Sequence, residues 1–210
     1  LNTDQLSAFD PEDLSVLSSD QISALKTEQI AGLTTNQIIA LTTSQLISLS
    51  SSQLTSLKTG QIAALTNTQI PSLTTAQIAA LKTSQITALT NSQIPQLTTA
   101  QIVALTTGQI AVLKTDQAVA LTPAQMGVIE TQDIAAFSTS DIAALTSNQI
   151  TALTTNQIVA LTPAEIQAIS LDDIAALTTA QLAAMTTGQI MALSSDQFEA
   201  LTTTQIPALT

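Results

Sequence analysis

The chain has 210 residues, mostly Thr, Ala, Leu, Ile, Gln and Ser, and its formal net charge is −11 with four Lys and no Arg. Cys, His, Trp and Tyr do not occur, which excludes disulfide scaffolds, thiol and imidazole catalysis and the usual zinc sites. The negative charge also argues against nucleic acid as a partner, because a polyanion would be repelled.

The whole chain is a tandem repeat of eight residues. Counted from Leu1, residues 1–208 form 26 octets without an insertion or deletion, and the positions of each octet are numbered 1 to 8. We therefore expect residues 1–210 to be a single uninterrupted array. Because the chain starts without Met and begins and ends inside the repeat, we also expect it to be a fragment of a longer chain.

Three positions carry apolar or small residues and are predicted to point inward. Position 1 is Leu in 21 octets, position 6 is Ile or Leu in 23, and position 8 is mostly Ala. Position 5 is Gln in 21 octets and otherwise an acid, which predicts a need for a hydrogen-bond acceptor. These acids are Asp13, Asp133, Asp141, Glu165 and Asp173. Positions 2, 3, 4 and 7 are predicted to face water.

In chain order, the first cluster of acids is DPED in the second octet, with Asp10, Glu12 and Asp13. Three carboxylates so close together could bind a cation. We favour the alternative, in which Asp10 caps a helix while Glu12 and Asp13 face the positive end of its dipole. We therefore expect no metal site here.

The fifth octet shows the local helix signal clearly. Thr34 and Gln37 stand in the S/T-x-x-E/Q relation of a capping box, and most other octets repeat this spacing. The pattern predicts a helix over residues 35–41, and in general one helix per octet from position 3 to position 1 of the next. Proline at position 3 agrees, because the first helical residue needs no N–H. These prolines are Pro11, Pro123 and Pro163.

One continuous helix does not fit the repeat. Eight residues advance a helix so that equivalent positions drift by about 80° per octet, and no apolar stripe persists.

Two residue types should alter the short helices. Lys at position 2 cannot accept the capping bond, so the following Thr could cap instead. Pro at position 7 should shorten the helix to barely one turn. They are Lys26, Lys58, Lys82 and Lys114, and Pro71, Pro95 and Pro207.

Octets 15 to 17 depart most from the repeat, at Ala118, Met126, Gly127, Ile129, Glu130, Gln132 and Asp133. This stretch could be a partner site or a bend, or it could reflect neutral drift in a redundant array, which we favour.

Further along, Leu171 at position 3 is a candidate contact point. Asp172 and Asp173 are expected to face the positive end of a helix dipole.

These patterns predict an all-α solenoid of about 26 units, each one very short capped helix plus a tight turn, with Leu and Ile stacked into a continuous core. Helices this short are unstable alone, so neighbouring units must supply the stability. A β-solenoid is the alternative, because Thr and Ile favour strands. It fits less well, since five Gly are too few to turn so many corners.

The stretches LTTAQIAAL, ALTTNQIVAL and ALTTGQIAVL resemble the LTTxQIxA octapeptide-repeat arrays of very large bacterial secreted proteins, which are described as adhesion or haem-utilisation proteins. The resemblance covers the whole chain. It implies a secreted, surface-associated spacer, stalk or fibre, and it carries over no functional residue.

No group of residues suits catalysis, because the Ser and Thr hydroxyls have no His and no suitably spaced Lys. We expect no enzyme activity and no cofactor, but a structural scaffold at the bacterial surface or outside the cell. The alternative is a binding surface for glycan, protein or ice on the rows of Thr. The expected partners are the chain itself or neighbouring repeat modules stacked end to end, with no nucleic acid and no membrane insertion.

Overall fold

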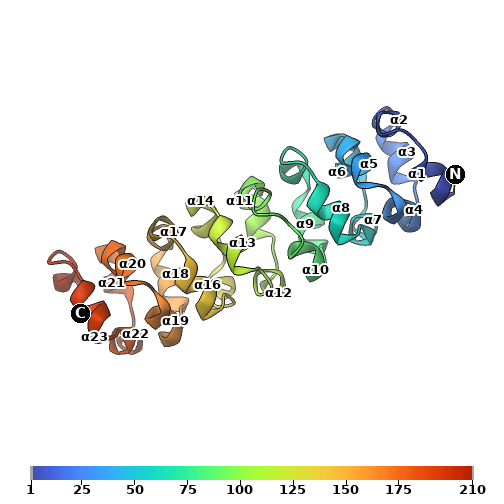
Figure 1. The fold of residues 1–210 in the computed structure, drawn as a ribbon. Helices are drawn as coiled ribbons and strands as arrows, with labels where there is room; N and C mark the ends of the chain where they lie inside the picture. Colours follow the sequence, from blue (N-terminus) through green and yellow to red (C-terminus); the bar gives the residue numbers. More distant parts are fainter. Residues whose placement is uncertain (1, 210) are drawn as a thin grey trace. The chain divides into compact units, whose positions relative to one another are not determined.

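The computed structural model describes residues 2–209, which form short helices joined by tight turns (Figure 1). The chain divides into two compact units, an N-terminal unit of Leu1–Leu105 and a C-terminal unit of Thr106–Thr210. No strand occurs within residues 2–209. The predicted all-α solenoid is therefore confirmed, and the β-solenoid alternative is wrong.

Twenty-three α-helices and three 3₁₀ helices cover residues 2–209. In the N-terminal unit they are α1 (Thr3–Ser7), α2 (Pro11–Ser15), α3 (Ser19–Ser23), α4 (Thr27–Gly32), α5 (Thr35–Ala40), α6 (Thr43–Ser48), α7 (Ser51–Ser56), α8 (Thr59–Ala64), η1 (Ile70–Ser72), α9 (Thr75–Ala80), α10 (Thr83–Ile86), η2 (Ile94–Gln96) and α11 (Thr99–Val103). In the C-terminal unit they are α12 (Thr107–Ile110), α13 (Thr115–Ala120), α14 (Pro123–Met126), α15 (Thr131–Ile134), α16 (Thr139–Ala144), α17 (Ser147–Ala152), α18 (Thr155–Ala160), α19 (Pro163–Ala168), α20 (Leu171–Ala176), α21 (Thr179–Ala184), α22 (Thr187–Ala192), α23 (Ser195–Ala200) and η3 (Ile206–Ala208).

The α-helices begin at position 3 of each octet, as predicted, and position 2 is the N-cap. In α5 the backbone N–H of Gln37 donates to Thr34 Oγ1 at 3.2 Å, and the Gln37 Oε1 accepts from the Thr34 N–H at 2.9 Å. Both halves of the capping box are therefore formed, which satisfies two N–H groups that the helix itself leaves unpaired.

The six-residue helices end one residue earlier than predicted, because position 1 has left the helical conformation, and the α-helices of four or five residues end earlier still. Leu41 follows α5 with φ −60° and ψ 132°, which is extended backbone, although its N–H still donates to the Ile38 carbonyl at 3.2 Å. The chain changes direction at positions 1 and 2, which form the corner between one helix and the next. Within residues 2–209 no residue has a positive φ, so these corners do not require glycine.

Lysine at position 2 does not move the cap. Lys58 remains the N-cap of α8, and Thr59 becomes the first helical residue, so the expectation that the following Thr would cap is wrong. The Lys58 N–H still donates to Gln61 Oε1 at 2.6 Å, which preserves half of the capping box. Proline at position 7 acts as predicted: η1 and η2, which contain Pro71 and Pro95, are 3₁₀ helices of 3 residues each.

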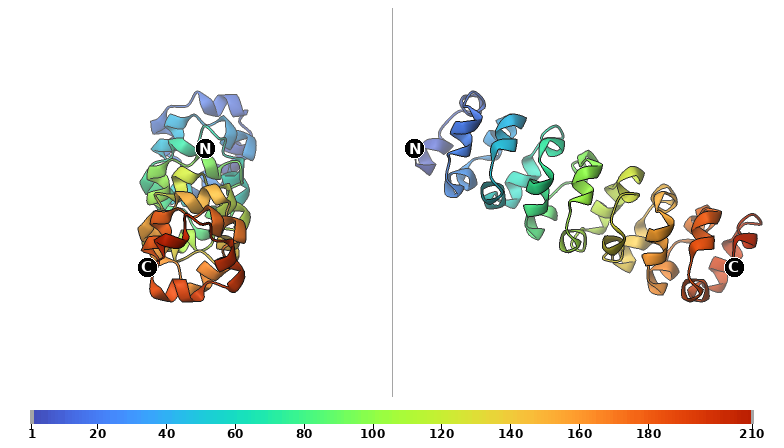
Figure 2. Two further views of the ribbon diagram at one scale, coloured as in Figure 1. Left: turned by 90° about the vertical axis from the view of Figure 1, so that its left-hand side faces the viewer. Right: turned by 180° about the vertical axis from the view of Figure 1, so that it is seen from behind.

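Within each unit the helices stack in three columns, because every helix packs on the helix three octets further along (Figure 2). In the N-terminal unit α2 packs on α5 and α5 on α8. In the C-terminal unit α13 packs on α16, α16 on α19, and α19 on α22. One superhelical turn therefore takes about three octets, a number that the repeat period alone does not contain.

The core consists of positions 1, 5 and 6. Ile38 at position 6 is 0% exposed and Leu41 at position 1 is 3% exposed, which confirms these two inward positions. Position 8 was predicted to be inward as well, but Ala40 and most of its equivalents are only half-buried. Gln at position 5 takes that place instead, and Gln37 is 1% exposed.

The missing side-chain cap at lysine can be measured. We expect Lys58→Thr to raise the free energy of unfolding by about 0.5–2 kcal/mol, because the new hydroxyl would accept from the Gln61 N–H as Thr34 does from Gln37. Thermal and urea unfolding followed by circular dichroism would measure the change. Lys58→Ala removes the charge without adding an acceptor, so an equal gain in that variant would contradict the capping explanation.

Candidate functional site

The side chain that recurs at the centre of the structure is the glutamine at position 5, and Gln77 shows its geometry. Its Oε1 accepts from the Thr74 N–H at 2.9 Å, within its own octet. Its Nε2 donates to the carbonyls of Leu46 at 2.9 Å, Ile47 at 3.3 Å and Leu49 at 2.8 Å, which belong to the preceding turn. One buried carboxamide therefore caps its own helix and bonds the helix to the turn before it.

The same bonds recur along both units and always span 28 to 31 residues. We call this row of side chains the glutamine ladder. Its members include Gln37, Gln45, Gln53, Gln61, Gln69, Gln77, Gln85, Gln93 and Gln101 in the N-terminal unit, and Gln149, Gln157, Gln181, Gln189, Gln197 and Gln205 in the C-terminal unit. Among residues 2–209 no buried side-chain nitrogen or oxygen lacks a partner.

Only glutamine can make all of these bonds, because it has an acceptor and two donors on one rigid amide at the required distance from the backbone. The acids at position 5 led us to predict an acceptor, and the bond to Oε1 confirms that half. The donor half was missed. A polar residue at one fixed position of every octet was the available signal, since burial of such a residue requires complete hydrogen bonding.

Aspartate at position 5 cannot bond the preceding carbonyls, because its carboxylate has no hydrogen to donate, and it accepts from hydroxyl groups instead. Asp141 is 8% exposed and accepts from the hydroxyl of Thr115 at 2.7 Å and from that of Ser138 at 2.7 Å. Asp133 accepts in the same way from Thr107 at 2.6 Å. Asp173 follows this pattern, with bonds from Ser147 and Ser170. Each of these carboxylates is therefore held by hydroxyl groups, one of them 26 residues back along the chain.

Glutamate at position 5 keeps the cap but loses the bond to the preceding turn. Glu165 is 5% exposed, and its Oε2 accepts from the Thr162 N–H at 2.7 Å. A carboxylate has no N–H to donate where glutamine would bond the carbonyls of Ile134 and Phe137. Within residues 2–209 no N–H or O–H donates to the carbonyl oxygen of Phe137. The same holds for the carbonyl oxygen of Leu145, which a glutamine in place of Asp173 would bond.

The acids considered as a cation site lie at the start of α2. Asp10 is the N-cap of α2, but its side chain makes no capping bond, so that part of the prediction is wrong. Glu12 and Asp13 lie in the first turn of α2 and are exposed, as is Asp172 in α20. In the described range 2–209, no three acidic, His or Cys side chains come close enough together to hold a metal ion.

Octets 15 to 17 continue the core without interruption. Ala118 and Met126 are both 0% exposed and take the position that Ile or Leu holds elsewhere. Gly127 lies against the next turn, because a Cβ built on it would stand 3.1 Å from the Ala152 carbonyl oxygen. Leu171 on α20, the candidate contact point, is 47% exposed.

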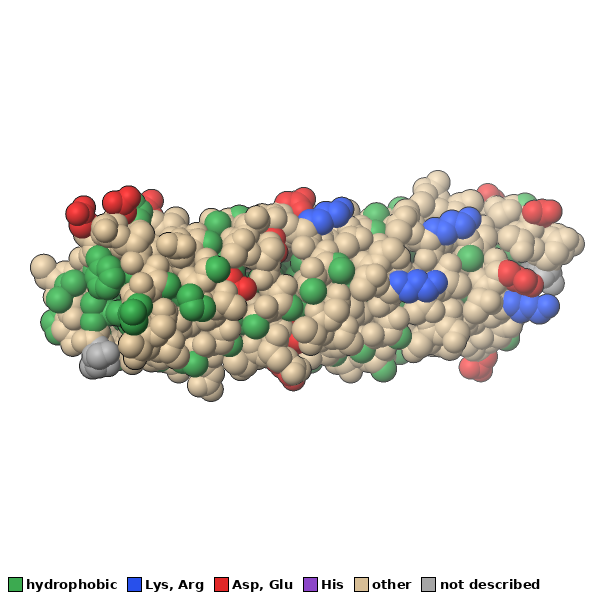
Figure 3. All heavy atoms as spheres, turned by 90° about the horizontal axis from the view of Figure 1, so that it is seen from below, with side chains coloured by type: hydrophobic (Ala, Val, Ile, Leu, Met, Phe, Trp, Pro, Cys, Tyr) green, Lys and Arg blue, Asp and Glu red, His purple; other side chains and the backbone are tan. Residues whose placement is uncertain are grey.

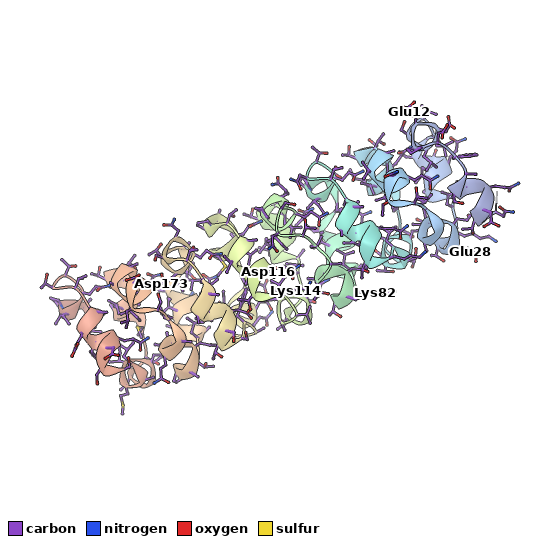
Figure 4. The ribbon with its side chains drawn as sticks, in the orientation of Figure 1. Glu12, Glu28, Lys82, Lys114, Asp116 and Asp173 are labelled. Carbon is purple, nitrogen blue, oxygen red and sulfur yellow. The ribbon has the colours of Figure 1, made fainter. Side chains whose placement is uncertain are left out.

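The outer faces carry short polar side chains with scattered charges (Figure 3). Lys26 and Glu28 form an ion pair of 3.8 Å, in which both side chains are largely exposed. Figure 4 shows Glu12 and Lys82 at the outer surface of the N-terminal unit, whereas Asp173 belongs to the buried row. No helix in residues 2–209 has more than 6 residues, so none could cross a lipid bilayer.

The glutamine ladder predicts opposite effects for two changes in adjacent octets. Glu165→Gln should raise the free energy of unfolding by about 1–2 kcal/mol, since the new Nε2 would bond the Ile134 and Phe137 carbonyls. Gln157→Glu should lower it by a similar amount, because it removes the bonds to Met126 at 2.8 Å and Ile129 at 2.7 Å. Urea unfolding would measure both variants.

Two exposed residues provide matched controls for charge. Glu199→Gln removes a charge in α23, and Gln167→Glu adds one in α19, and neither changes a side chain of the ladder. If these controls shift the unfolding midpoint as much as the ladder variants do, net charge explains the effect and the ladder does not.

Comparison with known proteins agrees with the repeat. The model of the family described as the ALTTAQ repeat matches residues 1–35, 59–91, 67–99, 92–123, 126–163, 158–187 and 174–210, which together cover most of the chain. No curated protein matches the chain. The octets, the helical units and these matches describe one tandem array, and the chain belongs to the ALTTAQ repeat family.

Proposed function

We propose that the protein is a non-enzymatic structural scaffold, a spacer or stalk whose length is set by its number of octets. The observation that supports this proposal is the glutamine ladder. Its bonds always span 28 to 31 residues, so each added octet finds its acceptors at the same distance as the last. A repeated bond of this kind extends a structure without requiring a unique residue anywhere in it.

The surface supports a spacer better than a catalyst. The core positions are filled by Leu, Ile and Gln, and the outer positions carry Thr, Ser, Ala and Asn. The hydroxyls of position 2 are already used as helix caps, as Thr34 and Thr74 show. This use disfavours the alternative, a glycan, protein or ice surface built from the rows of Thr, because the position 2 hydroxyls in those rows are engaged with the backbone.

We infer that the partner is the same kind of repeat, stacked end to end, and that the protein works outside the cell or at a bacterial surface. Stacking is supported by the packing within each unit, where α5 packs on α8 and the position 6 residues Ile38 and Ile62 are 0% exposed. The external location is supported by the resemblance to arrays of large secreted proteins and by the presence of only four Lys and no Arg, which leaves trypsin-like proteases few sites.

Insertion of whole and half octets tests the spacer. Duplication of residues 41–48 should leave helicity and the unfolding midpoint almost unchanged and should increase the maximum dimension in small-angle X-ray scattering. Duplication of residues 41–44 alone should lower the midpoint by several degrees, because it displaces each ladder glutamine from its carbonyls. Equal tolerance of both insertions, or no growth in dimension, would contradict a spacer measured in octets. Strong ice-recrystallisation inhibition or glycan-array binding would favour the alternative.

A further inference from the structure

The carboxylates at position 5 are not spread evenly through the chain. Between residues 29 and 125 this position is always Gln, and from residue 181 onwards it is Gln again. Four of the six octets between residues 133 and 173 carry an acid there. The C-terminal unit therefore contains one segment in which most of the glutamine ladder is replaced.

Two equivalent breaks in the stack show what the replacement changes. Separating the chain between residues 65 and 66 in the N-terminal unit would break the ladder bonds of Gln69, Gln77, Gln85 and Gln93, each of which makes two or three bonds across it. Separating it ten octets later, between residues 145 and 146, would break ladder bonds from Gln149 and Gln157 alone. The other two positions are Glu165 and Asp173.

The hydroxyl bonds of the carboxylates do not restore this connection. Thr115 and Asp141 both precede residue 145, and Ser147 and Asp173 both follow it, so neither bond crosses the break. The carbonyls of Phe137 and Leu145 also remain without a donor among residues 2–209. Across Leu145 the turns are therefore joined by the side-chain hydrogen bonds of Gln149 and Gln157 alone.

We propose that the corner at Leu145, between α16 and α17, is a hinge built into the C-terminal unit, where neighbouring turns separate more readily than they do at the equivalent corner at Leu65. The proposal rests on the spacer function. A stalk in which fewer bonds join the turns at one corner can open there and close again without unfolding elsewhere. Local opening of this kind is governed by the few bonds that cross the corner.

Hydrogen exchange of the whole chain tests the hinge. Backbone amides of residues 139–150 should exchange at least tenfold faster than those of residues 59–70, which occupy the same octet positions ten octets earlier. Glu165→Gln combined with Asp173→Gln restores both ladder positions and should slow exchange in residues 139–150 at least tenfold. Glu165→Gln alone keeps the side-chain length and should slow it about threefold, which preserves the test if the double variant does not fold.

Asp116→Asn combined with Glu199→Gln changes the charge equally at two exposed sites and should leave the exchange rates unchanged. The reverse change, Gln85→Glu with Gln93→Glu, should accelerate exchange in residues 59–70. Equal exchange of the two segments in the unmodified chain, or equal slowing in the charge control, would overturn the hinge. Neither result affects the dependence of length on octets, so the spacer and the hinge can fail separately.

Discussion

The carboxamide of glutamine is the interaction on which this fold depends. Its oxygen starts a helix and its nitrogen fastens that helix to the turn before it, as Gln77 does with Thr74 on one side and Leu46 and Leu49 on the other. Helices of four to six residues have no stability of their own in water. They persist here because each carboxamide joins a local capping bond to a bond between turns, while Leu and Ile beside it are removed from water.

The buried row of amides also determines which substitutions the array accepts. A buried polar side chain must have its partners, so position 5 tolerates only residues that can recreate them. Asp141 does so with the hydroxyls of Thr115 and Ser138, and Glu165 keeps only the cap. The outer positions have no such requirement, and Thr, Asn, Gly, Lys and Asp all occur there. Uniform cores and variable surfaces in this chain therefore have the same physical origin.

Local features were predictable from the sequence, and distant ones were not. The helix type and its start at position 3 follow from the capping spacing of residues such as Thr34 and Gln37, which acts over one turn. The helix end was predicted one residue late, because Leu41 satisfies an apolar pattern in either conformation. Burial of Gln37 was missed because its partners Leu6 and Phe9 lie 28 to 31 residues away, a separation that the repeat period does not reveal. The clustering of acids at position 5 could be seen in the sequence, but its effect on the bonds between turns could be recognised only from the positions of those partners.

The bonds of the glutamine ladder all point in one direction along the chain, since the donor always follows its acceptors by 28 to 31 residues. During synthesis, each octet that leaves the ribosome therefore brings an amide to carbonyls that have already emerged and stacked. Each ladder bond can therefore form as soon as its glutamine has been translated, because its acceptors lie earlier in the chain.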